Sequence, residues 1–143
     1  MRPFAALQEL TIYQGKREFT FKMQIEAVDG EITVIGLTPV HSRSFLINYK
    51  QGIVDYEEHP FFRYPLSPEQ MIADIQMAHI AVEEWQKHLQ NEEILVRKTE
   101  DSVIFQADGK NLVEIIKNQE KTILIHYGFK CKIVIRNLSF EKL

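Results

Sequence analysis

One long stretch of the chain, residues 67–89, places its apolar side chains at helical spacing. Ser67, Pro68 and Gln70 suit a helix start: a capping serine, a proline at the first helical position and a glutamine able to complete a capping box. The apolar stripe that follows consists of Met71, Ile72, Ile75, Ala78, Val82, Trp85 and Leu89. The pattern predicts one helix over Ser67–Leu89 whose stripe packs against a sheet.

The same stretch carries a second apolar side. Ala73, Met77, Ile80 and Ala81 lie off the main stripe, so the first turns are apolar nearly all round. This pattern has two interpretations: the helix bends near His79, or its second side meets a ligand.

Elsewhere apolar and polar residues alternate, which is the pattern of half-buried strands. The clearest run is Glu18–Ala27, and the strands begin at about Leu10. Further strands are predicted over residues 31–38, 42–50, 53–57, 93–99, 102–107, 112–117, 121–127 and 130–138.

Turn signals separate these strands. Asp29-Gly30, Gln51-Gly52 and Asp108-Gly109 are pairs that adopt positive φ angles readily and close tight hairpins. Gly36 interrupts a strand and indicates a bulge or sharp bend.

A count of about ten strands and one helix predicts a mainly β, α+β fold. One helix cannot cover so many strands evenly, so we expect a curved antiparallel half-barrel wrapped around one helical lid, which is either straight or bent. With 143 residues and no linker, the chain is predicted to form a single domain over residues 1–143.

Composition narrows the function classes. The chain has 17 basic and 20 acidic residues without a basic stripe, which argues against nucleic acid as a partner. The single cysteine, Cys131, excludes an internal disulfide and is predicted to be buried on a strand. There is no apolar run of about eighteen residues that could span a membrane. No signal peptide is visible, so Met1 is either a native start or the start of a mature fragment.

The sequence contains little evidence of a catalytic or metal-binding motif. His79 and Glu83 stand one turn apart on the predicted helix and could hold a metal or relay a proton, although a solvated surface pair is the favoured interpretation. No residue is nominated as a nucleophile, so we predict no catalytic residue, no metal and no cofactor.

Apolar side chains are the main functional signal. The inner faces of the strands and the helix stripe supply more aromatic and methionine surface than one helix needs to cover, which predicts an apolar cavity. The predicted cavity residues are Phe19, Phe21, Met23, Ile25, Val34, Phe45, Ile47, Met71, Ile75, Val82, Trp85 and Phe105.

Several strings resemble a proteobacterial lipoprotein family, domain of unknown function 3261. They are Leu37-Thr38-Pro39-Val40 with the strand Phe45–Tyr49, the helix opening Met71–Ile75, and the closing Lys132–Ile135. That family is itself similar to the outer-membrane lipoprotein localisation factors LolA and LolB. The likeness covers about Leu10 to Leu138.

The resemblance implies a half-open barrel with a helical lid, an apolar hollow for acyl chains, and a membrane-contact loop at Pro39 and Val40. In the LolB group this loop reads Asn-Pro-Leu-Gly, whereas here Thr38 and His41 replace the polar and glycine positions and Val40 is a smaller wedge. The expected location is the periplasmic face of the outer membrane, held by a lipid anchor that is absent from this chain.

The first functional hypothesis is therefore a non-enzymatic, monomeric lipoprotein that binds or transfers an acylated molecule. The second is a thioesterase-like, acyl-processing enzyme using His79, Glu83 and Asp74. The third is a structural adaptor in an envelope complex, with Val40 and the Phe61-Phe62 pair as contacts.

Overall fold

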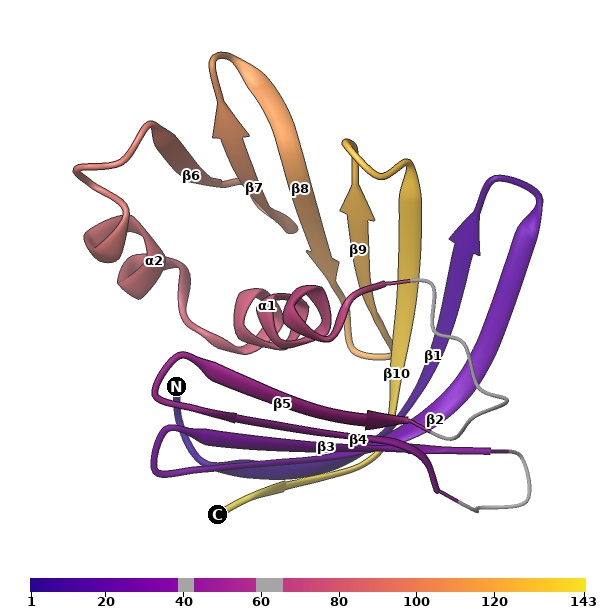
Figure 1. Cartoon of the computed structure of the whole chain (residues 1–143). Helices are drawn as coiled ribbons and strands as arrows, with labels where there is room; N and C mark the ends of the chain where they lie inside the picture. Colours follow the sequence, from indigo (N-terminus) through magenta and orange to yellow (C-terminus); the bar gives the residue numbers. More distant parts are fainter. Residues whose placement is uncertain (39–42, 59–65) are drawn as a thin grey trace.

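The computed structural model describes residues 1–38, 43–58 and 66–143 (Figure 1). Ten strands and two helices follow one another in this part of the chain: β1 (Phe4–Gln14), β2 (Arg17–Val28), β3 (Glu31–Leu37), β4 (Arg43–Lys50), β5 (Ile53–Glu58), α1 (Pro68–His79), α2 (Val82–His88), β6 (Ile94–Lys98), β7 (Ser102–Ala107), β8 (Lys110–Lys117), β9 (Thr122–His126) and β10 (Cys131–Lys142).

All ten strands form one antiparallel sheet in the order β5-β4-β3-β2-β1-β10-β9-β8-β7-β6. In Figure 1 the long strands β1, β2 and β10 curve through the middle of this sheet, and α1 lies in its concave space. The order ends at β5 and β6 without joining them, so the barrel stays open. The predicted half-barrel with a helix in its hollow is confirmed.

Strict alternation explains which face the sheet buries. Phe21, Met23, Ile25 and Ala27 of β2 are buried, whereas the residues between them face outward and are at least partly exposed. The same period places Ile32 and Val34 of β3 and Phe45 and Ile47 of β4 in the core. Because successive side chains of a strand point to opposite faces, one wet and one dry face follow directly from the sequence.

The three predicted hairpin turns are confirmed by their backbone angles. Asp29 and Gly30 have φ angles of 51° and 78°, and the other two pairs behave in the same way. Two residues with positive φ match the right-handed twist of the strands on either side.

Gly36 sits where a bulge was predicted, because the register between β3 and β4 shifts between Gly36 and Leu37. A Cβ atom at Gly36 would lie only 2.1 Å from the Phe45 ring. The glycine is therefore required by close packing of an aromatic ring onto the backbone.

The first strand begins earlier than predicted, at Phe4 rather than near Leu10. Leu7 masks the alternation there because it is an apolar residue on the outer, partly exposed face, while the polar Gln8 is buried. The Gln8 side chain donates a 2.9 Å hydrogen bond to Asn137 Oδ1, which offsets the cost of burying an amide.

The single helix predicted over Ser67–Leu89 is wrong in its continuity. α1 ends at His79, and α2 starts at Val82 after two extended residues, Ile80 and Ala81. Of the two interpretations of the apolar second side, the bend near His79 is thus observed. In the part of the chain described, neither helix is long and apolar enough to cross a bilayer.

Candidate functional site

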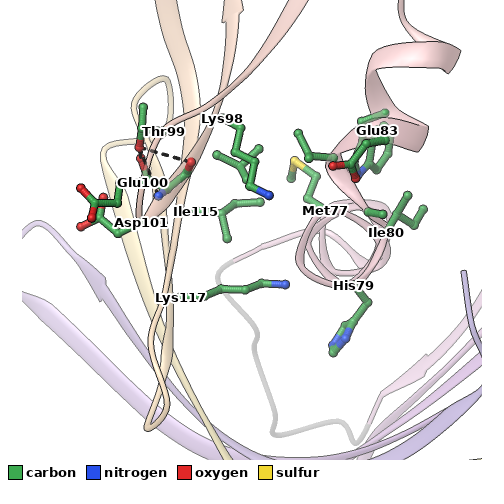
Figure 2. Close-up of a pocket in the computed structure, with 15 residues that line it drawn as sticks. Met77, His79, Ile80, Glu83, Lys98, Thr99, Glu100, Asp101, Ile115 and Lys117 are labelled. Carbon is green, nitrogen blue, oxygen red and sulfur yellow. Dashed lines mark hydrogen bonds between the residues drawn. The ribbon is translucent and has the colours of Figure 1, made fainter.

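A groove of about 420 Å³ opens where α1 gives way to α2 (Figure 2). One wall comes from the two helices and their connection, and the other from β6, β7, β8 and the β6–β7 turn. Its apolar lining consists of Met77, Ile80, Val82, Trp85, Val103 and Ile115. Ile115 and Val82 also belong to the buried core, so the floor of this helix-break groove is the core itself.

Polar residues surround the apolar floor. Lys98 and Lys117 extend toward the helices in Figure 2, whereas Glu100 and Asp101 lie on the outer side of the β6–β7 turn. The groove therefore combines an apolar lining with charged side chains. An apolar pocket with a few polar groups at its edge is the usual form of a small-molecule site.

The helix break is held in place by a lysine. The Lys117 side chain donates a hydrogen bond to the Ala78 carbonyl at the end of α1. The last carbonyls of a helix lack partners within it and attract cations, so this contact stabilises the end of α1. Partial burial lowers the pKa of Lys117 from its ordinary value.

His79, the last residue of α1, is packed among aromatic rings. It stacks on Phe4 with ring centroids 4.2 Å apart, and Phe140 lies parallel to it at 6.2 Å. Burial, together with the charge of Lys117, lowers the pKa of His79 to about 4. The ring is therefore neutral at pH 7, where it acts as an apolar surface.

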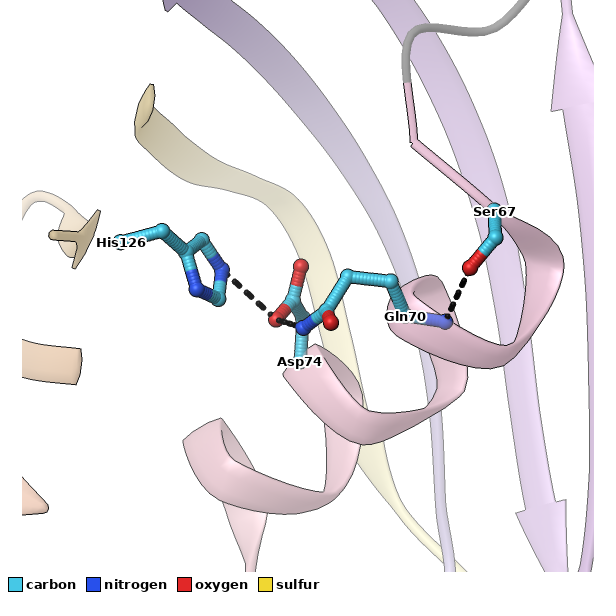
Figure 3. A network of polar contacts seen from close by, with 4 residues as sticks. All are labelled: Ser67, Gln70, Asp74 and His126. Atoms are coloured by element: carbon cyan, nitrogen blue, oxygen red, sulfur yellow. Dashed lines mark hydrogen bonds and ion pairs between the residues drawn. The ribbon is translucent and has the colours of Figure 1, made fainter. Parts of the chain in front are cut away.

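A polar chain connects α1 to the centre of the sheet (Figure 3). Ser67 Oγ accepts a 3.1 Å hydrogen bond from Gln70 N, which confirms the predicted cap. The Gln70 side chain donates to Asp74 Oδ1 at 2.8 Å, and His126 Nε2 of β9 lies 2.9 Å from the same oxygen. Gln70 thus serves Asp74 instead of closing a capping box.

The Asp74–His126 contact is almost fully buried, with exposed side-chain fractions of 9% and 2%. Its distance is that of an ion pair, yet His126 Nε2 lacks a well-aligned hydrogen-bond acceptor among the described residues. A buried carboxylate without a partner is costly, so Gln70 and His126 together make the position of Asp74 tolerable. We call the Asp74–His126 pair the α1 tether.

Cys131 lies opposite His126 in the β9–β10 register and is buried, as predicted. Burial raises the pKa of the Cys131 thiol, and the charge of Asp74 acts in the same direction. A protonated thiol is a poor nucleophile. The arrangement therefore gives Cys131, His126 and Asp74 a packing role and no activated nucleophile.

The helix break separates the residues that were predicted as a metal site, a proton relay or a thioesterase-like site. His79 and Glu83 do not stand one turn apart on a helix, because the chain is extended between them. Asp74 points to His126 and not to either of them. Within the described residues, no group of three His, Cys, Asp or Glu side chains is placed to hold a metal ion.

The family described as "Protein of unknown function (DUF3261)" matches residues 5–139. The chain belongs to this family. No curated protein matches it. The resemblance stated from the sequence strings is thereby confirmed for this DUF3261 protein.

Two solved structures are similar over nearly the whole chain. One is a "putative outer membrane lipoprotein-sorting protein domain" from Vibrio parahaemolyticus, 9% identical, with a TM-score of 0.46, covering 99% of this chain and 85% of that one. The other is a DUF1329 family protein from Desulfovibrio piger, 8% identical, with a TM-score of 0.38 and the same coverage. Likenesses this distant carry no argument about function.

The predicted cavity residues fall into three places in this DUF3261 protein. Val82 and Trp85 line the helix-break groove. Met23, Met71 and Ile75 surround a space of only about 20 Å³ beneath α1. The others pack in or against the core: Phe19, Phe21, Ile25, Val34, Phe45, Ile47 and Phe105. The residues Pro39, Val40 and Phe61-Phe62 lie outside the described part.

Sequence reasoning missed the α1 tether and most of the groove. Asp74 sits between Met71, Ile75 and Ala78 on the apolar stripe, so a charge on the buried side was visible. His126 lies two residues after Leu124 on β9, so strand alternation places it on the same buried face, and this spacing was the signal for a buried partner. No local sequence signal indicated that Lys98, Val103 and Lys117 line the groove, because their position there depends on where the sheet curves.

Proposed function

We propose that this protein binds a lipid-like ligand, such as an acylated molecule, in the helix-break groove. The observation that carries the proposal is an open groove whose floor is the apolar core at Val82 and Ile115. Each methylene of a hydrocarbon chain that is buried on that floor would contribute about 0.8 kcal/mol of favourable binding free energy. A dozen methylenes would thus contribute roughly 10 kcal/mol before the costs of ordering the ligand and the protein.

Trp85 adds support for an acylated ligand. Its ring meets Phe105 edge-on at 5.6 Å, while its Nε1 atom is buried and has no hydrogen-bond acceptor among the described residues. A buried donor without a partner costs free energy. The ester or amide carbonyl of an acyl group is an acceptor that a small shift of α2 would bring to this nitrogen.

We further propose that α1 moves as a lid. The small space beneath it, near Met23, Met71 and Ile75, is separated from the groove by the end of α1. Ile80 and Ala81 are extended and could act as a hinge, while the α1 tether holds the closed state. Outward movement of α1 would join the two spaces and expose the predicted cavity residues to a longer chain.

The cellular role that fits this site is passive carriage. A monomeric protein facing the periplasm at the outer membrane would take up an acylated molecule and release it again, as lipoprotein localisation factors do. The resemblance of the sequence strings to those factors and the apolar lining of the groove support this role. No observation favours the thioesterase or adaptor hypotheses over it.

Titration with a fluorescent fatty acid, followed by native mass spectrometry, tests the proposal. We expect saturable one-to-one binding, weakened at least about tenfold in Ile80→Glu because a carboxylate would lie against the hydrocarbon. Leu95→Glu is the matched control, since Leu95 is 67% exposed on the edge strand β6. Absence of saturable binding, or equal loss in both variants with unchanged circular dichroism, would overturn the proposal.

A further inference from the structure

Three hairpin turns gather at one end of the sheet, away from the helix-break groove. They join β1 to β2, β7 to β8 and β9 to β10, and all three point toward the top of Figure 1. Gln14 pairs with Cys131, and Tyr127 N donates a 3.0 Å hydrogen bond to Leu112 O, so the turns are neighbours. The sheet register therefore builds one surface from three distant parts of the sequence.

Large apolar side chains are exposed at this end. Tyr13, Leu112, Tyr127 and Phe129 have exposed fractions of 40%, 39%, 43% and 53%. We call these four residues, with the basic residues described next, the tip surface. The other exposed large apolar residues in the described part are at the two edge strands or near the chain termini. Tyr13 and Leu112 lie near the ends of β1 and β8, and Tyr127 and Phe129 lie in the β9–β10 turn, so the four gather at one end of the sheet. Clustered exposed apolar residues mark interaction sites.

Charge at the tip opposes that of the molecule. Residues 14–17, 108–112 and 127–132 contain five basic side chains and one acidic one, Asp108, in a chain of formal net charge −3. The basic residues are Lys16, Arg17, Lys110, Lys130 and Lys132. The nearest other acids are Glu18, paired with Tyr13, and Glu114, which accepts a 2.8 Å hydrogen bond from the Tyr127 hydroxyl.

The chemistry of the tip surface fits a lipid headgroup layer. Tyrosine rings favour the membrane interface because one end is apolar and the other polar. Lysines extend past an apolar contact to reach charged groups, and Lys132 already lies 5.7 Å from the centre of the Tyr13 ring. Each basic residue near an anionic bilayer adds attraction, which salt weakens.

We propose that the tip surface docks peripherally on an anionic lipid bilayer. The positive turns supply the attraction, and Phe129 with the two tyrosines enters the headgroup layer. This docking goes beyond ligand binding, because it uses none of the groove residues. It is also separate from the predicted contact loop at Pro39 and Val40.

Vesicle sedimentation tests the proposal with the full chain. The wild type is mixed with phosphatidylcholine vesicles that either contain or lack phosphatidylglycerol. We expect it to bind only the anionic vesicles, which contain phosphatidylglycerol, and to dissociate from them at high salt. Replacing Lys130 and Lys132 with glutamine should weaken binding on the order of fivefold per lysine. Phe129→Ser should weaken it as well, whereas Leu95→Ser, at an exposed position on β6, should not.

Control measurements separate docking from other causes. Thermal melts must match the wild type, which we expect because all the substituted side chains are exposed. Light scattering without vesicles shows whether the tip surface instead pairs two copies of the chain. Equal binding to both vesicle types, no binding to either, or tip-dependent dimerisation would each overturn the proposal.

Discussion

At the scale of single residues, the structure depends on a few polar groups placed inside an apolar interior. Gln70 donates a hydrogen bond to Asp74, and the buried His126 ring lies against the same carboxylate where α1 meets the sheet. The sequence showed a charge on the apolar stripe, but it could not name the partner, because His126 is far away along the chain. The buried aliphatic residues, in contrast, followed from alternation alone.

Removing one partner of the α1 tether should destabilise the protein. We expect Asp74→Ala to cost about 3 kcal/mol, because His126 would lose the carboxylate that its buried ring faces. Replacing both residues with leucine should cost much less, since no buried polar group is left without a partner. Urea unfolding of Asp74→Leu, His126→Leu and the variant with both leucines measures the coupling, and additive losses among these three would show that the pair does not interact.

His79 should make stability depend on pH. Its pKa is lowered from 6.5 to about 4, so between these values the unfolded chain binds a proton that the folded chain does not. Stability should therefore fall as the pH drops from about 6.5 to 4, by on the order of 2 kcal/mol given its partial exposure. His79→Phe keeps the ring stacking and should remove this part of the decline in urea unfolding at several pH values. An unchanged slope would contradict the assignment.

At the scale of elements, glycine and the helix break show what patterns can and cannot predict. The turns and the bulge at Gly36 were predictable because each needs a backbone conformation that few residues adopt. The break after His79 was predicted only as one of two interpretations. At the break, Lys117 of β8 donates a hydrogen bond to the Ala78 carbonyl, a tertiary contact with α1 that no local pattern indicates.

Adding a side chain at Gly36 should weaken the β3–β4 pairing. An alanine methyl would collide with the Phe45 ring, which is almost fully buried in the core. We expect Gly36→Ala to lower stability by about 1–3 kcal/mol. Gly128→Ala is the matched control, because a Cβ there meets nothing within 4 Å. Equal melting temperatures for the two variants would show that the Phe45 contact is not tight.

Proline substitutions test the helix break. Ala81 has a φ angle of −60° and follows an extended Ile80, so Ala81→Pro should be tolerated or should stabilise by up to about 1 kcal/mol. In Ala73→Pro the proline lies inside α1 and should cost about 3 kcal/mol or more. Thermal melts compare them. A large loss in Ala81→Pro would indicate one continuous helix over both segments.

At the scale of the whole molecule, the sheet curves because three long strands bend around α1, and this leaves a groove where the helices part. The sequence predicted the half-barrel and an apolar interior. It did not predict that most of the interior beneath α1 would be filled and that open space would lie at the helix break. Such space depends on how side chains from separate elements meet, which no local pattern records.

The most direct measurement of the central claim is photo-crosslinking with a fatty acid that carries a diazirine on its chain. Mass spectrometry of the digested protein then maps the labelled residues. We predict labels at Met77, Ile80 and Val82 and at Val103 and Ile115, with competition by unlabelled fatty acid. Labels spread over the convex face of the sheet, or no label that the competitor removes, would contradict a ligand site at the helix break.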